Sequence, residues 1–281
     1  MRIFNSIHSL RGAIKILKSR KKRIGFVPTM GALHRGHGSL FLRSRRENDI
    51  TVVSIFVNPK QFGLREDFDA YPRPEKSDIL LAKKEMVDII FYPSENEMYR
   101  TGFLTSVQVD TISQILCGKS RPGHFRGVTT VVNKLLNIVA PDVLYLGQKD
   151  TQQAVLIKRM IADLNIPVTV RICPIVRERD GLALSSRNCY LSARQRLEAP
   201  ILYRALQNAK QKALEGEHRS LHLGRFIRST IARQSSGKID YIACVDADTL
   251  APLRRLRGKI MIALAVKFGK TRLIDNIVFS L

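Results

Sequence analysis

The sequence predicts an α/β protein, with a Rossmann-like parallel sheet in an N-terminal domain and a smaller α+β C-terminal domain. The first observation is that apolar runs of strand length alternate with helix-like segments from residue 24 to about residue 172. Such alternation is typical of right-handed βαβ units and a mostly parallel sheet. The second observation is that, after Ile175, helical segments are followed by strand-like runs. We therefore expect one domain over residues 1–175 and another over residues 176–281.

In the first domain, apolar runs and prolines set the expected elements. Residues 50–57 (ITVVSIFV) are almost continuously apolar, as in a parallel strand covered on both faces. Pro28 has no amide hydrogen, so the strand before it should end there. Pro74 suits the first turn of a helix. The expected strands are 24–27, 50–57, 87–92, 143–146 and 168–172, with a short edge strand at 105–109, and the expected helices are 36–48, 74–86, 127–139 and 149–164.

The second domain is expected to begin with two helices and to end with three strands. Ser192 can cap a long helix over residues 192–214, because its hydroxyl can accept a hydrogen bond from the first turn. A second helix is expected at 221–233, and strands at 239–245, 259–266 and 273–279. Helices followed by strands in this way indicate a small α+β domain.

The composition indicates a soluble globular protein. The chain has 281 residues, of which 44% are hydrophobic and 25% are charged. No apolar run reaches the roughly 18 residues that a membrane-spanning helix needs. The N-terminus lacks the apolar core of a signal peptide, so we expect a cytoplasmic protein without a membrane partner. The four cysteines form no CxxC pair, which argues against disulfides and a structural metal.

The formal net charge of +23 is compatible with nucleic acid, an anionic membrane or small anionic substrates. The basic residues are dispersed through amphipathic stretches. The chain has no Trp, and its 7% aromatic residues leave few platforms for stacking bases. We therefore favour a solvated basic face with positions for small anions, and we expect no nucleic-acid partner.

A glycine-rich turn with two histidines follows the first expected strand, in the stretch FVPTMGALHRGH (residues 26–37). Gly31 and Gly36 let the backbone approach a ligand closely or adopt a positive φ. The helix expected from Gly36 would offer free amides and the positive end of its dipole to a phosphate. His34 and His37 would lie beside this anion site. The HxGH spacing is typical of Rossmann-type nucleotidyl-transferring enzymes, and the alternative is an ordinary helix start with surface histidines.

Two further polar segments directly follow expected strands, so they should lie at the same ligand-binding edge of the sheet. In residues 58–63, Gln61 can donate hydrogen bonds to, and accept them from, a hydroxyl or carboxylate. In residues 147–153, Lys149 offers a point charge for phosphate and Asp150 can bind a ribose hydroxyl. Gln153 follows one helical turn later and can face the same cleft.

Two loops add cationic groups. Ser185, Ser186 and Arg187 together suit a polyphosphate, and they lie in a loop with Gly181 upstream, as in a mobile loop that closes over a triphosphate. Residues 121–127 (RPGHFRG) form a stiff cationic loop before a helix. An approach to an anionic substrate, a packed connection and an oligomer contact all remain open for this loop.

Taken together, seven segments resemble the pantoate–beta-alanine ligase family, the pantothenate synthetases. They are FVPTMGALHRGH, FVNPKQFG, AYPRPEKSD, RPGHFRGVTTVVNKL, YLGQKDTQQ, LALSSRNCYLS and TRLIDN. The resemblance covers about residues 24–276. It implies an acid–amino-acid ligase in which ATP and pantoate give pantoyl adenylate and pyrophosphate, after which beta-alanine attacks to give pantothenate and AMP.

The resemblance also implies functions for particular residues. According to the resemblance, residues 1–175 form the ATP- and pantoate-binding domain, and residues 176–281 form a lid. Gln61 and Gln153 bind pantoate, and Gln61 also binds beta-alanine. Mg²⁺ accompanies ATP, with Asp78 as the protein carboxylate nearest to it, and the protein is a homodimer. The implied catalytic residues are His37, the proton donor, with His34, Lys149 and Arg187. The implied ATP-binding residues are Met30, Gly31, Ala32, Leu33, His34, Arg35, Gly36, His37, Gly147, Gln148, Lys149, Asp150, Val176, Leu184, Ser185, Ser186 and Arg187.

Two other functions compete with the ligase. A nucleotidyltransferase that makes a dinucleotide product would keep the HxGH turn but has no use for Gln61 and Gln153. An RNA-binding protein on a class I synthetase-like scaffold would account for the charge of +23. It should show a contiguous basic and aromatic surface away from the cleft.

Overall fold

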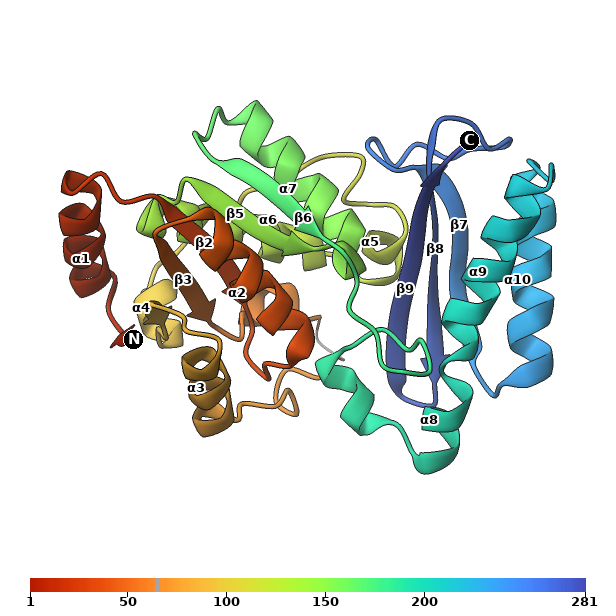
Figure 1. Ribbon diagram of the computed structural model, residues 1–281, viewed down its shortest axis with the longest axis horizontal. Helices are drawn as coiled ribbons and strands as arrows, with labels where there is room; N and C mark the ends of the chain where they lie inside the picture. Colours follow the sequence, from red (N-terminus) through yellow and green to blue (C-terminus); the bar gives the residue numbers. More distant parts are fainter. Residues whose placement is uncertain (64–65) are drawn as a thin grey trace.

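The computed structural model describes residues 1–63 and 66–281, and its centre is a six-stranded parallel sheet (Figure 1). The strand order is β1-β4-β3-β2-β5-β6, so β2 and β3 are central. The strands are β1 (Arg2–Phe4), β2 (Ile24–Thr29), β3 (Ile50–Ile55), β4 (Ile89–Phe91), β5 (Val143–Gly147) and β6 (Thr169–Cys173). This arrangement confirms the predicted Rossmann-like fold.

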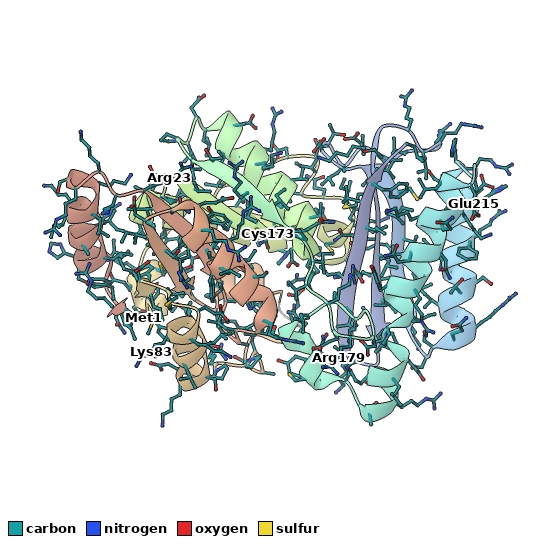
Figure 2. All side chains as sticks on the ribbon, viewed as in Figure 1. Met1, Arg23, Lys83, Cys173, Arg179 and Glu215 are labelled. Atoms are coloured by element: carbon teal, nitrogen blue, oxygen red, sulfur yellow. The ribbon has the colours of Figure 1, made fainter. Side chains whose placement is uncertain are left out.

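Helices cover both faces of this sheet, which explains why β2 and β3 are apolar almost throughout. One face packs on α6 and α7 through residues such as Phe26 and Leu136, and the other packs on α2 through Val27 and Phe41. Figure 2 shows side chains filling these layers, with long polar side chains at the rim. The helices are α1 (Ile7–Ser19), α2 (Arg35–Glu47), α3 (Glu75–Lys84), α4 (Glu95–Met98), α5 (Cys117–Ser120), α6 (His124–Val139) and α7 (Thr151–Asp163).

A three-stranded antiparallel sheet, in the order β7-β8-β9, lies beside the first sheet (Figure 1). Its strands are β7 (Lys238–Asp246), β8 (Lys259–Phe268) and β9 (Thr271–Ser280), and α8 (Ala193–Glu198), α9 (Ile201–Leu214) and α10 (Ser220–Gln234) precede them. The two faces of β8 are both buried. Ile262 and Leu264 pack in the core that includes α9 and α10, whereas Met261 and Ala263 pack with Val155 of α7. The second sheet is therefore joined to the first one through α7.

Pro28 does not end the first predicted strand, because β2 continues to Thr29. The carbonyl of Ile24 bonds toward the β5 side, and that of Thr29 bonds toward β3. By the alternation of a parallel ladder, Pro28 points toward β5. The pairing with β5 stops at Phe26, so the missing amide hydrogen of Pro28 breaks no ladder bond.

Two other expected elements were wrong. Residues 105–109 form no strand, and the backbone of Val107 instead bonds to the side chains of Thr129 and Thr130. The helix predicted over 192–214 is two helices, because Pro200 separates α8 from α9. Ser192 caps α8 as predicted, and its hydroxyl accepts a hydrogen bond from Gln195 N. Neither β1 nor α1 was expected from the sequence. In the described part of the chain, no helix has the length and apolarity needed to cross a bilayer.

Candidate active site

A cleft opens where the carboxyl ends of β2, β3 and β5 meet, at the edge of the sheet where ligands bind in α/β folds. Three segments enter it directly from these strands: the turn after β2, η1 (Pro59–Gln61) after β3, and η2 (Gln148–Asp150) after β5. Residues 174–176 and 184–187 also border it. Of the residues that the sequence singled out, the cleft is lined by Met30, His34, Gly36, His37, Gln61, Gly147, Lys149, Asp150, Gln153, Val176, Leu184, Ser185, Ser186 and Arg187.

The two histidines form the start of α2. His34 is the N-cap residue, and its Nδ1 accepts a hydrogen bond from Gly36 N over 3.1 Å. His37 Nδ1 accepts one from His34 N over 3.2 Å, so two rings perform the reciprocal capping usually done by Ser and Glu. The ring centroids are 4.2 Å apart. A Cβ at position 36 would lie 2.8 Å from His34 Cε1, so only glycine leaves room for this ring.

Both imidazoles are neutral at pH 7. Burial, followed by the charge of Lys149, lowers the pKa of His34 to about 4. Burial, with His34 and Lys149 nearby, holds the pKa of His37 well below its usual range. A neutral imidazole carries one N–H. Because Nδ1 accepts a hydrogen bond in each ring, the hydrogen is on Nε2, and each histidine has one N–H left to donate to a ligand.

Gln61 is positioned by Asn58 and by the close approach of α6. Asn58 Nδ2 donates to Gln61 Oε1 over 3.0 Å and to the carbonyl of Gly127 over 3.1 Å. The hydroxyl of Tyr99 donates to Asn58 Oδ1 over 2.8 Å, which fixes the amide of Asn58. A Cβ at position 127 would overlap the carbonyl oxygen of Lys60. Gly127 therefore lets α6 touch the backbone of η1.

The loop at residues 121–127 is a packed connection beside Gln61. Arg121 forms an ion pair with Glu66 at 2.5 Å, and its Nη1 lies 3.0 Å from His124 Nε2. His124 Nδ1 lies 2.8 Å from the carbonyl oxygen of Gln61. Burial and the charge of Arg121 lower the pKa of His124 to about 4, so this ring accepts from Arg121 and donates to Gln61. Arg121 and His124 also line the cleft, so the loop borders the ligand space.

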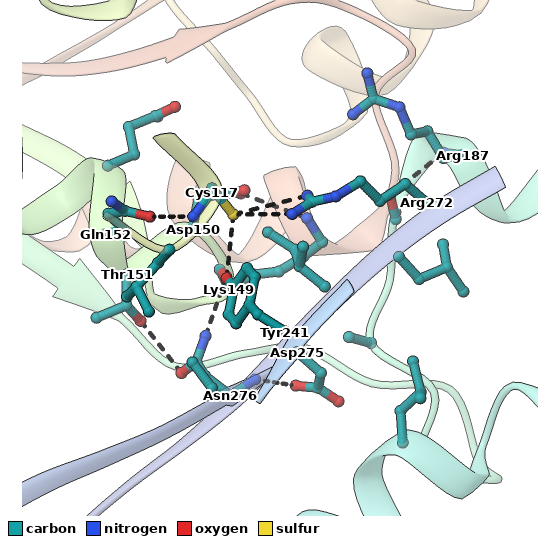
Figure 3. Close-up of a pocket in the computed structure, with 18 of the residues that line it drawn as sticks. Cys117, Lys149, Asp150, Thr151, Gln152, Arg187, Tyr241, Arg272, Asp275 and Asn276 are labelled. Atoms are coloured by element: carbon teal, nitrogen blue, oxygen red, sulfur yellow. Dashed lines mark hydrogen bonds and ion pairs between the residues drawn. The ribbon is translucent and has the colours of Figure 1, made fainter. Parts of the chain in front are cut away.

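The last strand of the second sheet reaches the segment that carries Lys149 and Asp150. Asn276 of β9 donates from Nδ2 to the carbonyls of Gln148 and Lys149, each over 3.0 Å. Its Oδ1 accepts a hydrogen bond from Thr151 Oγ1 over 3.2 Å, as Figure 3 shows. The neighbouring Asp275 forms two hydrogen bonds with Arg177, at 2.6 and 2.8 Å. The TRLIDN segment thus fixes the backbone of η2.

Arg187 lines the same cleft as the histidines and is paired with a carboxylate. Its Nε and Nη2 donate to Asp67 over 3.0 and 2.8 Å. The hydroxyls of Ser186 and Tyr71 are 3.2 Å apart. These contacts join the segment 185–187 to the segment 67–71.

A second cavity adjoins the cleft and shares Lys149, Gln153 and Arg187 with it. Figure 3 shows that its wall includes Cys117 and Arg272. Cys117 Sγ lies 3.1 Å from the hydroxyl of Tyr241 and 3.5 Å from Arg272 Nη2. Since α5 carries Cys117 and the second sheet carries the other two residues, this cluster joins the two parts of the molecule.

Some implied site residues do not line the cleft. Arg35 points to Glu178, with an ion pair of 2.9 Å, and Gln148 contributes its carbonyl to Asn276. Asp78 is 1% exposed and lines a separate small cavity behind the turn. The residues of the implied ATP and metal sites outside the cleft lining are Gly31, Ala32, Leu33, Arg35, Gln148 and Asp78.

Four polar side chains near the cleft lie in the quoted segments but were given no individual role from the sequence: Asn58, Tyr71, His124 and Asn276. Asn58 carried a usable signal, because an Asn before a Pro directly after a strand suits the cap of a short helical turn. The partner of Tyr71 is 115 residues away, and those of Asn276 are 125 to 128 residues away. Local patterns singled out the segments of both residues, but residue spacing does not reveal partners so far away in the sequence.

A Rossmann-like sheet whose HxGH turn, Lys149 and Arg187 line one cleft at the carboxyl ends of the strands is typical of an α/β enzyme that binds a nucleotide. The family model described as pantoate-beta-alanine ligase matches residues 2–278. The chain is 54% identical to the pantothenate synthetase of Caldicellulosiruptor saccharolyticus, over 99% of both chains. The crystal structure of pantothenate synthetase from Thermus thermophilus superposes with a TM-score of 0.94, at 44% identity over 99% of both chains.

A further solved structure is that of pantoate-beta-alanine ligase from Francisella tularensis, complexed with beta-gamma ATP and beta-alanine. Its TM-score is 0.80 at 39% identity, and the match covers 99% of this chain and 97% of that one. The chain therefore belongs to the pantoate–beta-alanine ligase family of enzymes, which confirms the resemblance drawn from its motifs.

Proposed function

We propose that this enzyme joins pantoate to beta-alanine in two steps and releases AMP and pyrophosphate. The observation that carries the proposal is that two neutral imidazole donors, Lys149 and the paired glutamines Gln61 and Gln153 line one cleft of a member of this family. The Francisella relative with ATP and beta-alanine bound supports the choice of these substrates.

In the first step, a carboxylate oxygen of pantoate attacks the α-phosphorus of ATP. The new O–P bond forms as the bond from the α-phosphorus to the bridging oxygen breaks, and pyrophosphate leaves with the electron pair. Carboxylate and triphosphate repel each other, so the enzyme must place positive groups and donors between them. Lys149 supplies the charge, and His34 and His37 supply Nε2–H donors. His37 therefore acts as a neutral hydrogen-bond donor. This is a narrower role than the proton donor that the resemblance implies.

In the second step, the amine of beta-alanine attacks the acyl carbon of pantoyl adenylate. A C–N bond forms, the C–O bond to AMP breaks, and the amine loses its proton to solvent. Gln61 and Gln153 orient pantoate in both steps, and Asn58 holds Gln61 in place. The adenylate hydrolyses readily, so a closed cleft protects it.

The remaining implied residues bind ATP. Asp150 holds the ribose, while Ser185, Ser186 and Arg187 bind the departing phosphates. In the structure Arg187 is paired with Asp67, so it exchanges this carboxylate for phosphate oxygens when ATP enters. Within this proposal, residues 1–175 carry the substrate sites and residues 176–281 act as the lid.

Mg²⁺ is proposed to enter with ATP on its phosphate oxygens. The described residues contain no group of three side chains of the types that ligate metals. Asp78 does not line the cleft and is only 1% exposed, and its two oxygens hold backbone amides of the turn, so it does not fit as the ligand of an ion that rides on ATP in the cleft.

The proposal is tested by incubating the purified protein with ATP, Mg²⁺, pantoate and beta-alanine. AMP and pantothenate should accumulate in equal amounts, and exchange of labelled pyrophosphate into ATP should require pantoate alone. Formation of AMP that does not require both pantoate and beta-alanine would refute the proposed ligase activity. A dinucleotide product would favour the nucleotidyltransferase instead.

Two further parts of the proposal are a cytoplasmic location and a homodimer. For a homodimer, light scattering should give about twice the 31.8 kDa of the chain.

A further inference from the structure

The turn between β2 and α2 has an unfavourable backbone that requires support. Gly31 has a φ of 79° and Ala32 a φ of 48°, so two successive residues are left-handed. Glycine adopts this region freely, whereas Ala32 is strained there. The next residue, Leu33, is followed by His34, which is the N-cap residue of α2. The position of His34 therefore depends on a turn that would relax if nothing held it.

Asp78 of α3 supplies the support. Its Oδ2 accepts a hydrogen bond from Ala32 N over 2.9 Å, and its Oδ1 accepts one from Leu33 N over 2.7 Å. A carboxylate that receives two amides in this way is a stronger acceptor than a neutral group. The fit is tight, because a Cβ on Gly31 would lie 2.9 Å from Asp78 Oδ2.

The location of Asp78 separates it from the reacting groups. It is 1% exposed, and it lies with Gly31 and Ile55 around a small cavity that is distinct from the cleft. Met30 borders both spaces, so the turn itself stands between this carboxylate and the ligand space. Asp78 thus contacts the back of the turn, whose front carries His34.

We propose that Asp78 is a positioning residue: its buried carboxylate holds the amides of Ala32 and Leu33, and so sets the place of His34 and of the start of α2. It acts through the turn and does not bind the metal that accompanies ATP. The kinetic consequences of this inference rest on the proposed function, whereas the support of the turn itself does not.

The first test measures hydrogen–deuterium exchange of the Ala32 and Leu33 amides, in EDTA and without ATP. The variant is Asp78→Asn, whose amide keeps one acceptor and places a donor against the second amide. Glu75→Gln on the same helix is the matched control, because Glu75 is exposed. We expect at least tenfold faster exchange in the Asp78 variant and no change in the control. Unchanged exchange in the Asp78 variant would overturn the inference, since metal and substrate are absent.

The second test measures turnover while Mg²⁺ is varied at saturating ATP. For Asp78→Asn we expect kcat/KM for ATP to fall about 100-fold, the scale of a catalytic group misplaced by about 1 Å. The half-saturating Mg²⁺ concentration should stay within twofold of the unmodified enzyme. Rescue of the rate by high Mg²⁺ or by Mn²⁺ would instead make Asp78 a metal ligand and overturn the inference.

Asp78→Glu provides a second variant should the asparagine variant fold poorly, with thermal unfolding as the check. It keeps the charge but moves the carboxylate by one methylene, so a positioning residue should lose activity and a metal ligand should keep much of it. Full activity in this variant would overturn the inference. Absence of product with the unmodified enzyme would refute the proposed ligase, and the exchange experiment would still decide the function of Asp78.

Discussion

At the scale of single residues, the site depends on which atom of each side chain is already engaged. His34 and His37 use Nδ1 for the backbone and keep Nε2–H for a ligand. Gln61 uses its amide oxygen for Asn58. The motifs predicted that these residues share a cleft, because each follows a strand of one sheet. The tautomers and the Asn58 contact depend on atomic geometry that residue spacing does not specify.

His37→Ala and Lys149→Ala should each lower kcat by two or more orders of magnitude, because each removes a contact to charge that develops in the transition state. Steady-state kinetics measures the loss, and circular dichroism with thermal unfolding checks the fold. A folded variant with a near-normal rate would remove that residue from the mechanism.

His34 and His37 should not titrate in the physiological range. NMR of the Cε1–H signals between pH 8 and 5.5 should show both rings neutral throughout, since burial lowers both pKa values and that of His34 is about 4. The Cε1–H signal that disappears in the His34→Asn variant is the signal of His34. A midpoint near 6.5 in either ring would contradict the neutral tautomers.

At the scale of elements, the strands and helices of the parallel sheet were predicted because their apolar runs are long and regularly spaced. The failures have local causes. The apolar pattern continues across Pro200, which hid the break between α8 and α9. The three residues of β1 are too few to form a pattern. In residues 105–109, the threonines of α6 replace a neighbouring strand as hydrogen-bond partners.

The contact between α6 and η1 gives an element-scale prediction. Gly127→Ala should destabilise the fold by about 1–3 kcal/mol, because the new Cβ would press on the carbonyl of Lys60. The displaced η1 should also raise KM for pantoate through Gln61. Gly224→Ala in α10 is the control, because no atom lies within 4 Å of its added Cβ, and it should stabilise by about 0.5–1 kcal/mol. Urea unfolding measures both, and equal effects would contradict the prediction.

At the scale of the whole molecule, the second sheet supports the cleft from outside its lining, through the contact of Asn276 with η2. The sequence predicted the two kinds of sheet, since their patterns of elements differ. It could not place Asn276 against Gln148 or Arg187 against Asp67, because these contacts depend on how distant segments meet. The cleft contains only a few cationic side chains, so the site accounts for a small part of the net charge of +23.

Stability should fall as the pH drops from 6.5 towards 5. His34, His37 and His124 are neutral in the folded protein, with lowered pKa values, whereas in the unfolded chain they take up protons below about pH 6.5. Each contributes a loss of up to about 1.4 kcal/mol per pH unit, which ends as the pH reaches the folded pKa. Denaturant unfolding at several pH values measures the slope, and His124→Asn should reduce it. A slope unchanged by that substitution would contradict the assignment.

The contact between β9 and η2 has a consequence for how the enzyme is made. Asn276 lies in the last strand of the sequence, yet it holds the backbone that carries Lys149. During translation, the parallel sheet and its histidine turn emerge long before this asparagine does. A nascent chain can therefore fold its parallel sheet while η2 still lacks its support. Activity should appear only after β9 has been synthesised, and chains terminated before β9 should fold in part and lack activity.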